Sequence, residues 1–226
     1  MGKHITFEDV KSSAEISTYI KKGNDLLGVM GFTEHGFAHA GTVSGKAAEI
    51  LEALDYPERV VELAKIAGHI HDIGNCVNRH DHAQSGAVMA FRILDRMGFD
   101  AEELADIVGA IGNHDEGTGT AVSPISAALI LADKSDVRRS RVRYKNRKAV
   151  NLSTDIHDRV NYAVHKSDLK LNAEKTSITL ELEIDTEISA VMEYFEIFLT
   201  RMMMCRNAAA FLNLSFELNI NNIKLL

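Results

Sequence analysis

The sequence predicts a mainly α-helical protein that ends in a small α+β unit. Up to about residue 166 the apolar residues recur at helical spacing, whereas after about residue 167 they alternate with polar residues, as in half-buried strands. Only two prolines occur in 226 residues, so few helix breakers interrupt the chain. We therefore expect a helical domain over residues 1–166 and a tail over residues 167–226. The tail would cover the domain or pair two subunits.

Local signals place three helices of the first part. Pro57 suits the first turn of a helix that continues through VVELAKIAGHI, residues 60–70. Asp100 can cap a second helix, and Ser123 followed by Pro124 is the start of a third, apolar one, ISAALILADKSD. The second helix carries an amphipathic stripe of Leu104, Ile107, Val108 and Ile111.

The tail shows two alternating segments. Residues 178–184 and 212–220 each place an apolar residue at every second position, which predicts two half-buried strands. One long helix, roughly 187–211, lies between them. The tail should therefore hold two or three strands and one helix.

Composition narrows the class of protein. A net charge of −7 argues against general nucleic-acid binding, because most of the surface would repel a phosphate backbone. The exception is residues 138–148, where seven of eleven residues are basic. No signal-peptide pattern or membrane-spanning apolar run is visible, and Cys76 and Cys205 fit no metal-binding or disulfide spacing, so we expect a cytoplasmic, reduced, water-soluble protein.

Histidines are concentrated in one stretch of the chain. Seven of the ten fall between positions 35 and 114, and neutral imidazoles together with carboxylates suit a divalent transition metal, Mn or Fe and also Zn. His71 and Asp72 are adjacent at a predicted helix end, and His35 and His39 would share a face if that segment is helical. The seven are His35, His39, His69, His71, His80, His82 and His114.

Five motifs around these residues resemble one family. In chain order they are HAGTVSGKA from His39, HDIG from His71, HAQSGA from His82, NHDEG around His114 and LADKSD around Asp133. Together they resemble the HD superfamily of metal-dependent phosphohydrolases over about residues 35–140. They are most similar to the two-metal members related to the cyclic-dinucleotide phosphodiesterases with a GYP motif. GYP itself is absent, and Asn75 stands where those relatives usually carry a Lys.

The resemblance implies an HD-domain helical bundle and a role for each matching residue. His39, His71, Asp72 and Asp133 would hold a first metal, with Asp72 bridging to a second that His82 and His114 complete. His35 is a further candidate ligand, and His80 is the reserve for His82. We also expect Asp72, His114 and Lys134 to take part in catalysis, and the following residues to bind substrate phosphate: Lys134, Arg138, Arg141 and Arg143.

The chemistry expected of this site is hydrolysis of a phosphomonoester or phosphodiester. A divalent metal lowers the pKa of bound water from about 15.7 towards 7 and so makes hydroxide available. The substrate would be a small phosphate ester, most plausibly a nucleotide, and a homodimer is reasonable. Three alternatives fit parts of the pattern: a di-iron oxygenase on the same ligands, a non-catalytic nucleotide sensor that keeps the metal, and an RNA-binding protein that uses residues 138–148.

Overall fold

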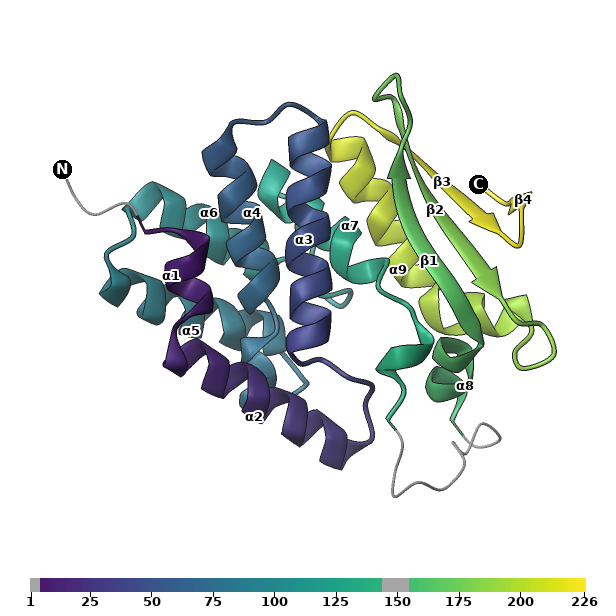
Figure 1. The fold of residues 1–226 in the computed structure, drawn as a ribbon, viewed down its shortest axis with the longest axis horizontal. Coiled ribbons are helices and arrows are strands. Elements are labelled where there is room, and N and C mark those ends of the chain that lie inside the picture. Colours follow the sequence, from purple (N-terminus) through teal and green to yellow (C-terminus); the bar gives the residue numbers. More distant parts are fainter. Residues whose placement is uncertain (1–4, 144–154) are drawn as a thin grey trace.

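The computed structural model describes residues 5–143 and 155–226, and it confirms the predicted mainly helical fold. The first part is a bundle of seven helices with two 3-10 turns (Figure 1). The helices are α1 (Phe7–Lys11), α2 (Ala14–Met30), α3 (Phe37–Ala53), α4 (Glu58–Ile70), α5 (His82–Met97), α6 (Ala101–Gly112) and α7 (Pro124–Lys134). The turns are η1 (Ile73–Cys76) and η2 (Arg139–Arg141).

The tail pairs a small sheet with one long helix. It follows a further helix, α8 (Ile156–Ala163), and its elements are β1 (Val164–Leu171), β2 (Ser177–Ile184), α9 (Val191–Phe211), β3 (Ser215–Ile220) and β4 (Ile223–Lys224). The sheet order is β1-β2-β3-β4: β2 is antiparallel to β1, with Leu169 opposite Leu180, and parallel to β3, with Leu180 opposite Leu218. The crossover between the two parallel strands is α9, as parallel pairing requires.

The sequence signals for helix starts are confirmed. The Asp100 carboxylate accepts a hydrogen bond from the Glu102 amide at the start of α6, and the Ser123 hydroxyl accepts one from the Ser126 amide at the start of α7. Pro124 is then the first residue of α7, where its missing N–H costs nothing. Short-range capping chemistry therefore fixes these boundaries.

The strand count differs from the expectation of two or three. Four strands form within the described residues, and the unpredicted β1 begins at Val164, in a segment expected to be helical. Its sequence, VHKSDLKL, hides the strand because β1 is an edge strand, and most of its side chains are only partly buried. Partial burial does not impose strict alternation of apolar and polar residues.

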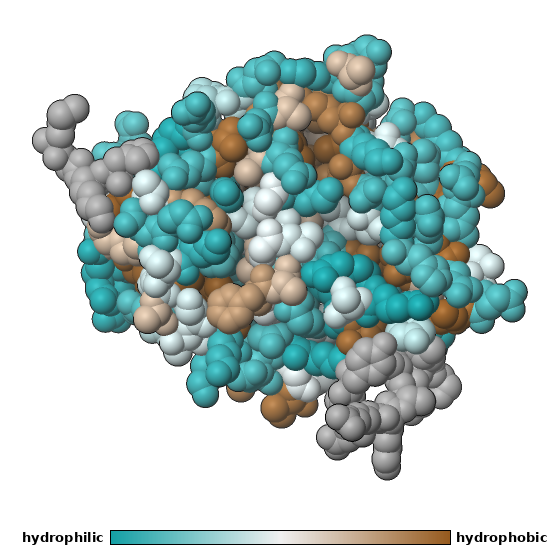
Figure 2. Space-filling model, in the orientation of Figure 1, coloured by the Kyte–Doolittle hydropathy of each residue, from teal (hydrophilic) through white to brown (hydrophobic). Residues whose placement is uncertain are grey.

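The core runs through both parts of the molecule. Buried apolar side chains of the bundle and of the tail form one continuous cluster. At its centre α7 is buried along its whole length between α3, α4 and α6 on one side and α9 on the other. Hydrophilic residues predominate on the face shown in Figure 2. No helix in the described ranges combines the length and apolar character needed to cross a membrane.

Candidate metal centre

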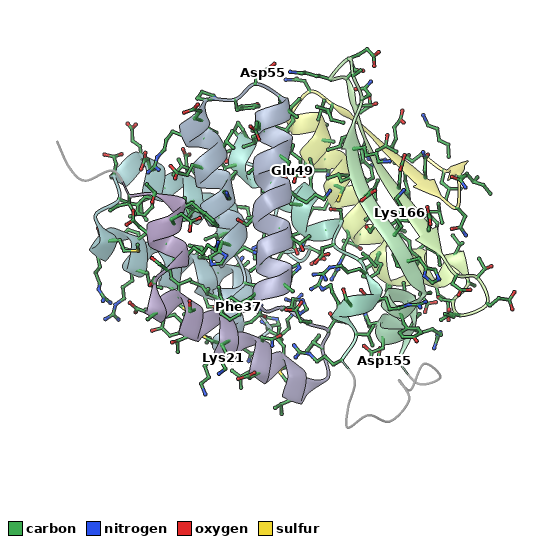
Figure 3. The ribbon with its side chains drawn as sticks, in the orientation of Figure 1. Lys21, Phe37, Glu49, Asp55, Asp155 and Lys166 are labelled. Atoms are coloured by element: carbon green, nitrogen blue, oxygen red, sulfur yellow. The ribbon has the colours of Figure 1, made fainter. Side chains whose placement is uncertain are left out.

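Six polar side chains from five segments converge inside the bundle. His39 comes from the first turn of α3, whose start is marked by Phe37 in Figure 3, while His71 and Asp72 lie between α4 and η1. His82 is the first residue of α5, His114 follows α6, and Asp133 is near the end of α7. The four imidazoles are at most 2% exposed, and the Asp72 and Asp133 side chains are 10% and 12% exposed.

Asp72 lies at the middle of this cluster. Its Oδ2 is 3.7 Å from His39 Nε2 and 3.5 Å from His71 Nε2, whereas its Oδ1 is 3.5 Å from His82 Nε2 and 3.9 Å from His114 Nε2. The carboxylate thus has one oxygen towards each pair of histidines. This is the geometry expected of a ligand shared by two neighbouring sites.

Asp133 closes the side of the cluster formed by His39 and His71. Its Oδ1 is 3.2 Å from His39 Nε2 and 3.7 Å from His71 Nε2. Three overlapping groups of side chains place their ligand atoms within 4.8 Å of one another. The groups are His39–His71–Asp72, His71–His114–Asp133 and Asp72–His82–His114.

The orientation of each imidazole is set by a hydrogen bond at Nδ1. His71, His82 and His114 donate from Nδ1 to backbone carbonyls, those of Gly68 (2.9 Å), Arg79 (3.0 Å) and Ile111 (2.6 Å). His39 donates from Nδ1 to the Asp136 carboxylate at 2.7 Å. With Nδ1 donating outward, each Nε2 faces the centre, which is how proteins orient imidazoles that hold a metal.

The atoms facing inward fit a cation. His39 Nε2, His71 Nε2 and Asp72 Oδ2 are buried without a hydrogen-bond partner among the described residues. The Nε2 atoms of His82 and His114 face each other at 3.1 Å, and the Arg79 guanidinium also reaches His82 Nε2, at 3.2 Å. Four nitrogens and two carboxylates suit Mn, Fe or Zn. Burying such polar atoms unpaired is costly, and the cluster is one that could hold a metal ion.

Electrostatics keep the carboxylates ionised. Burial alone would raise the pKa of Asp72, but the surrounding histidines, His71 foremost, hold that pKa well below its ordinary value. Burial opposes ionisation of Asp133 in the same way, and the Lys134 ammonium outweighs it, so the pKa of Asp133 is also well below its usual range. Both carboxylates are therefore anionic at neutral pH.

Burial keeps most of the imidazoles neutral. Desolvation lowers the pKa of His114 and His82, leaving Nε2 free of a proton at pH 7. His71 differs: burial lowers its pKa, but Asp72 and Asp133 more than compensate, and the net shift is upward. A bound cation would take the place of that proton in the field of the two carboxylates.

The position of His71 and Asp72 depends on close packing of the next residues, in η1, against the start of α5. A Cβ on Gly74 would lie 2.0 Å from the His82 carbonyl oxygen and 2.5 Å from the Gly86 amide nitrogen. Gly74 is therefore needed because η1 packs directly on the first turns of α5. This contact holds His82 beside Asp72.

Several residues of the surrounding network were not assigned a role from the sequence. Asn75, noted only for replacing a Lys, donates from Nδ2 to Asp72 Oδ1 at 2.8 Å and so orients the carboxylate shared by the two sites. Asp136 orients His39, and Arg138 Nε and Arg141 Nη1 lie 2.7 and 3.7 Å from its carboxylate oxygens. The position of Asp136, three residues after Asp133, is a signal that could have identified it.

The two remaining histidine candidates lie in different surroundings. His35 precedes α3 instead of lying one helical turn before His39, so the two do not share a helix face. Its ring centroid is 5.4 Å from that of His39, at the edge of the cluster, and its Nδ1 contacts the Thr33 carbonyl oxygen at 2.8 Å. His80 is exposed and pairs with Asp81 at 2.7 Å, so His82 is the residue brought to the centre.

The expected phosphate-binding residues mostly contact the protein itself. Lys134 Nζ, 3% exposed as a residue, lies 2.8 Å from Asp133 Oδ2 and 3.3 Å from Glu116 Oε2. Arg143 donates to the Phe32 carbonyl at 2.8 Å and the Thr33 carbonyl at 3.1 Å. These contacts hold the loop before α3 in place. The remainder of the basic run, residues 144–148, lies outside the described residues.

A cavity of about 260 Å³ next to His35 is lined by three arginines and, from the α8 side, by Asp155 and Asp158. Arg141, one of the expected residues, lines it, together with Arg79 and Arg201, which the sequence did not single out. Arg79 Nη1 is 3.2 Å from His82 Nε2, and His35 also lines the cavity. The cavity therefore lies directly beside the cluster. Arg201 comes from α9 in the tail and forms an ion pair with Glu116, with Nε 2.6 Å from Oε1.

Comparison with known proteins agrees with this geometry. The family model described as HD domain matches residues 36–148, half of the chain, and that range contains all six side chains of the cluster. The chain belongs to the HD domain family. His35 falls just outside the matched range, in keeping with its place at the edge of the cluster.

Two similar proteins extend the comparison. An uncharacterized protein of Methanocaldococcus jannaschii is 24% identical, and the match covers 83% of this chain and 84% of that protein. A solved structure described as a predicted HD superfamily hydrolase, from an uncultured Thermotogales bacterium, is 29% identical. That match covers 55% of this chain and 67% of the other, with a TM-score of 0.43.

Proposed function

We propose that this HD domain protein is a metal-dependent phosphohydrolase that cleaves a small phosphate ester. The observation that carries the proposal is the shared carboxylate of Asp72, with two lone-pair nitrogens within 4 Å of each oxygen. His39, His71, Asp72 and Asp133 would hold one divalent metal, and Asp72, His82 and His114 a second. The metals would supply activated water at neutral pH and positive charge for the phosphoryl oxygens.

The chain itself supplies positioning and a dry environment. Hydrogen bonds at Nδ1 fix the imidazoles before any ligand arrives, so little reorganisation is needed during reaction. Asn75 and Lys134 hold the two carboxylates at the same time. Lys134 is thus better placed to position Asp133 than to contact substrate, whereas Asp72 and His114 remain the proposed catalytic ligands.

The arginine-lined cavity supports an anionic substrate of modest size. Arg79 and Arg141 project charge beside the centre, and guanidinium groups bind phosphate oxygens in a bidentate manner. A volume of about 260 Å³ is close to the lower end of small-molecule sites, which favours a compact ester over a polymer. The Arg79 guanidinium lies 5.8 Å from the centre of the Phe32 ring. A nucleobase in the cavity would be able to stack its flat face on the same guanidinium or ring. We therefore propose a nucleotide as the substrate.

The test is phosphate release by purified protein loaded with Mn, Fe or Zn. Nucleoside mono-, di-, tri- and cyclic phosphates would be supplied in turn, with metal content measured on the same samples. We expect turnover of one class that chelation abolishes and added metal restores. Metal-loaded protein that releases no phosphate would contradict the proposal; oxygen consumption by iron-loaded protein, or tight nucleotide binding without turnover, would then favour the oxygenase or the sensor.

Arg79 gives a sharper test of substrate binding. Arg79→Gln should raise KM for the anionic substrate about tenfold, because one charge-assisted contact is lost. Arg92→Gln, an exposed change on α5, is the matched control and should leave KM unchanged. Equal KM values in both variants would remove Arg79 from the substrate site.

A further inference from the structure

The long helix α9 carries a row of exposed side chains on the side opposite its buried face. Inward-facing residues such as Tyr194, Phe198 and Cys205 pack in the core between α7 and the sheet, behind β1 and β2 in Figure 1. Along the outer side Met192, Leu199 and Met203 are 74%, 53% and 48% exposed. Phe211, the last residue of the helix, is 43% exposed as well. Such exposure of large apolar side chains on one helix is unfavourable in water and indicates a missing partner.

The spacing of this row is that of a coiled-coil seam. Intervals of four and three residues alternate along the helix, which is the heptad pattern of a helix that packs lengthwise against another helix. We call the six exposed residues at these positions the α9 seam; they are Met192, Glu196, Leu199, Met203, Arg206 and Ala210.

The seam is also symmetric about the midpoint of the helix. Position 201 is central to α9 (Val191–Phe211), and it is equally distant from Leu199 and Met203 and from Glu196 and Arg206. Met192 and Ala210 are placed in the same way around it. A row with this symmetry can face an antiparallel copy of itself with every position matched.

We propose that a second copy of this chain packs on the α9 seam, antiparallel, about a two-fold axis at the midpoint of the helix. Leu199 of each copy then faces Met203 of the other, which forms an apolar centre. Glu196 faces Arg206 at each side, twice per dimer, and Met192 faces Ala210 at the ends. This is an isologous interface, in which each contact occurs twice.

Charge complementarity selects the antiparallel arrangement. Neither Glu196 nor Arg206 forms an ion pair within the described part of its own chain. A parallel pair would bring Glu196 against Glu196 and Arg206 against Arg206, and like charges at this range repel. The antiparallel pair replaces both repulsions with two attractions.

The size of the seam sets the expected strength. A helix of 21 residues is about 31 Å long, so two such helices bury an area at the lower end of stable interfaces. We therefore expect a reversible dimer whose population rises with protein concentration. This inference is independent of the proposed chemistry, since no seam residue belongs to the metal centre.

A charge-swap experiment tests the arrangement by sedimentation velocity over a range of concentrations. Glu196→Arg and Arg206→Glu alone should each weaken dimerisation at least tenfold, because each creates two like-charge contacts. The double variant, Glu196→Arg with Arg206→Glu, should restore it, because every pair is then complementary again. Leu199→Glu should give a monomer. Val88→Glu, a change at an exposed position of α5, is the control and should leave the dimer intact.

The outcomes separate cleanly. Circular dichroism shows whether each variant keeps its helices. A wild-type protein that stays monomeric at the highest concentration would overturn the proposal, and so would a dimer that is unaffected by Leu199→Glu. A dimer weakened by both single swaps but not restored by the double swap would overturn the antiparallel pairing.

Discussion

The metal centre and the tail bury opposite kinds of side chain. At the centre, four imidazoles and two carboxylates are enclosed with several of their atoms unpartnered. In the tail, β2 buries Ile178, Leu180, Leu182 and Ile184 on one face and keeps Thr and Glu on the other. On that outer face Lys170 pairs with Glu181 at 2.6 Å, and Lys224 with Glu217 at 2.8 Å.

The difference separates what folds the chain from what it does. Apolar burial in the tail stabilises the fold by about 25 cal/mol for each Å² removed from water. The polar cluster works against stability, because each buried unpaired polar atom costs free energy. Such local conflicts are expected at functional sites, where the surrounding structure compensates for them.

Removing the shared carboxylate should have the largest effect on function. Asp72→Ala takes away the only described carboxylate within 4 Å of all four Nε2 atoms, so we expect loss of bound metal and complete loss of turnover. Metal analysis and phosphate release measure both. Asp106→Ala, at an exposed position of α6, is the control and should behave as wild type. Retained metal and activity in the Asp72 variant would contradict the site assignment.

Truncating a buried side chain of the tail should lower the stability of the fold without changing metal binding. Leu180 is completely buried in β2, and Leu180→Ala should lower the free energy of unfolding by about 2–5 kcal/mol, measured in urea. Bound metal per folded molecule should not change. Thr179→Ala, on the opposite face of the same strand, should cost under about 1 kcal/mol, since it loses only a peripheral hydrogen bond to Glu217. Equal costs would show that the sheet is not buried on one side only.

Loosening the support behind a ligand should have an intermediate effect on metal binding. Asp136→Asn weakens the hydrogen bond that orients His39, and we expect metal affinity to fall about 10–100-fold, measured against a competing chelator. Asp168→Asn, at a partly exposed position of β1, should leave affinity unchanged. An unaltered affinity in the Asp136 variant would mean that His39 needs no such support.

The smallest effect concerns an ion pair between α8 and α9. Hydrogen bonds from Arg159 and Ser189 lower the pKa of Glu193 to about 2. Because the folded-state pKa is below the ordinary value, this pair adds stability above about pH 4.5 and loses it as the pH falls towards 2. Arg159→Gln should return the pKa towards 4.5, as measured by NMR of the carboxyl group. A pKa that stays near 2 would show that Arg159 is not the cause.

The sequence predicts those parts of the molecule that depend on short-range chemistry. Caps at Asp100 and Ser123 lie within three residues of the amides they satisfy, so both helix starts were predictable. The six candidate ligands were expected from their ordered motifs, and they lie together in the structure: His39, His71, Asp72, His82, His114 and Asp133. Their convergence, unlike the caps, required a resemblance, because spacing alone cannot bring five segments to one point.

The remaining features of the site and the surface could not be predicted, because they depend on tertiary contacts. Arg201 reaches the cavity from α9, far along the chain, and no local pattern marks it. Gly74 is needed for the space between η1 and α5, which only the packed structure reveals. The α9 seam could not be predicted for a related reason: only the exposure of its apolar residues in the folded chain shows that they face outward.

The most direct test of the account is an anomalous difference map from crystals grown with Mn. The account predicts density within coordination distance of Asp72 and of the Nε2 atoms of His39 and His71, with a second peak between Asp72, His82 and His114. Crystals of the Asp72→Ala variant should show neither peak. Density confined to exposed residues such as His80 and Asp81, or no density in metal-loaded wild-type crystals, would contradict the metal centre.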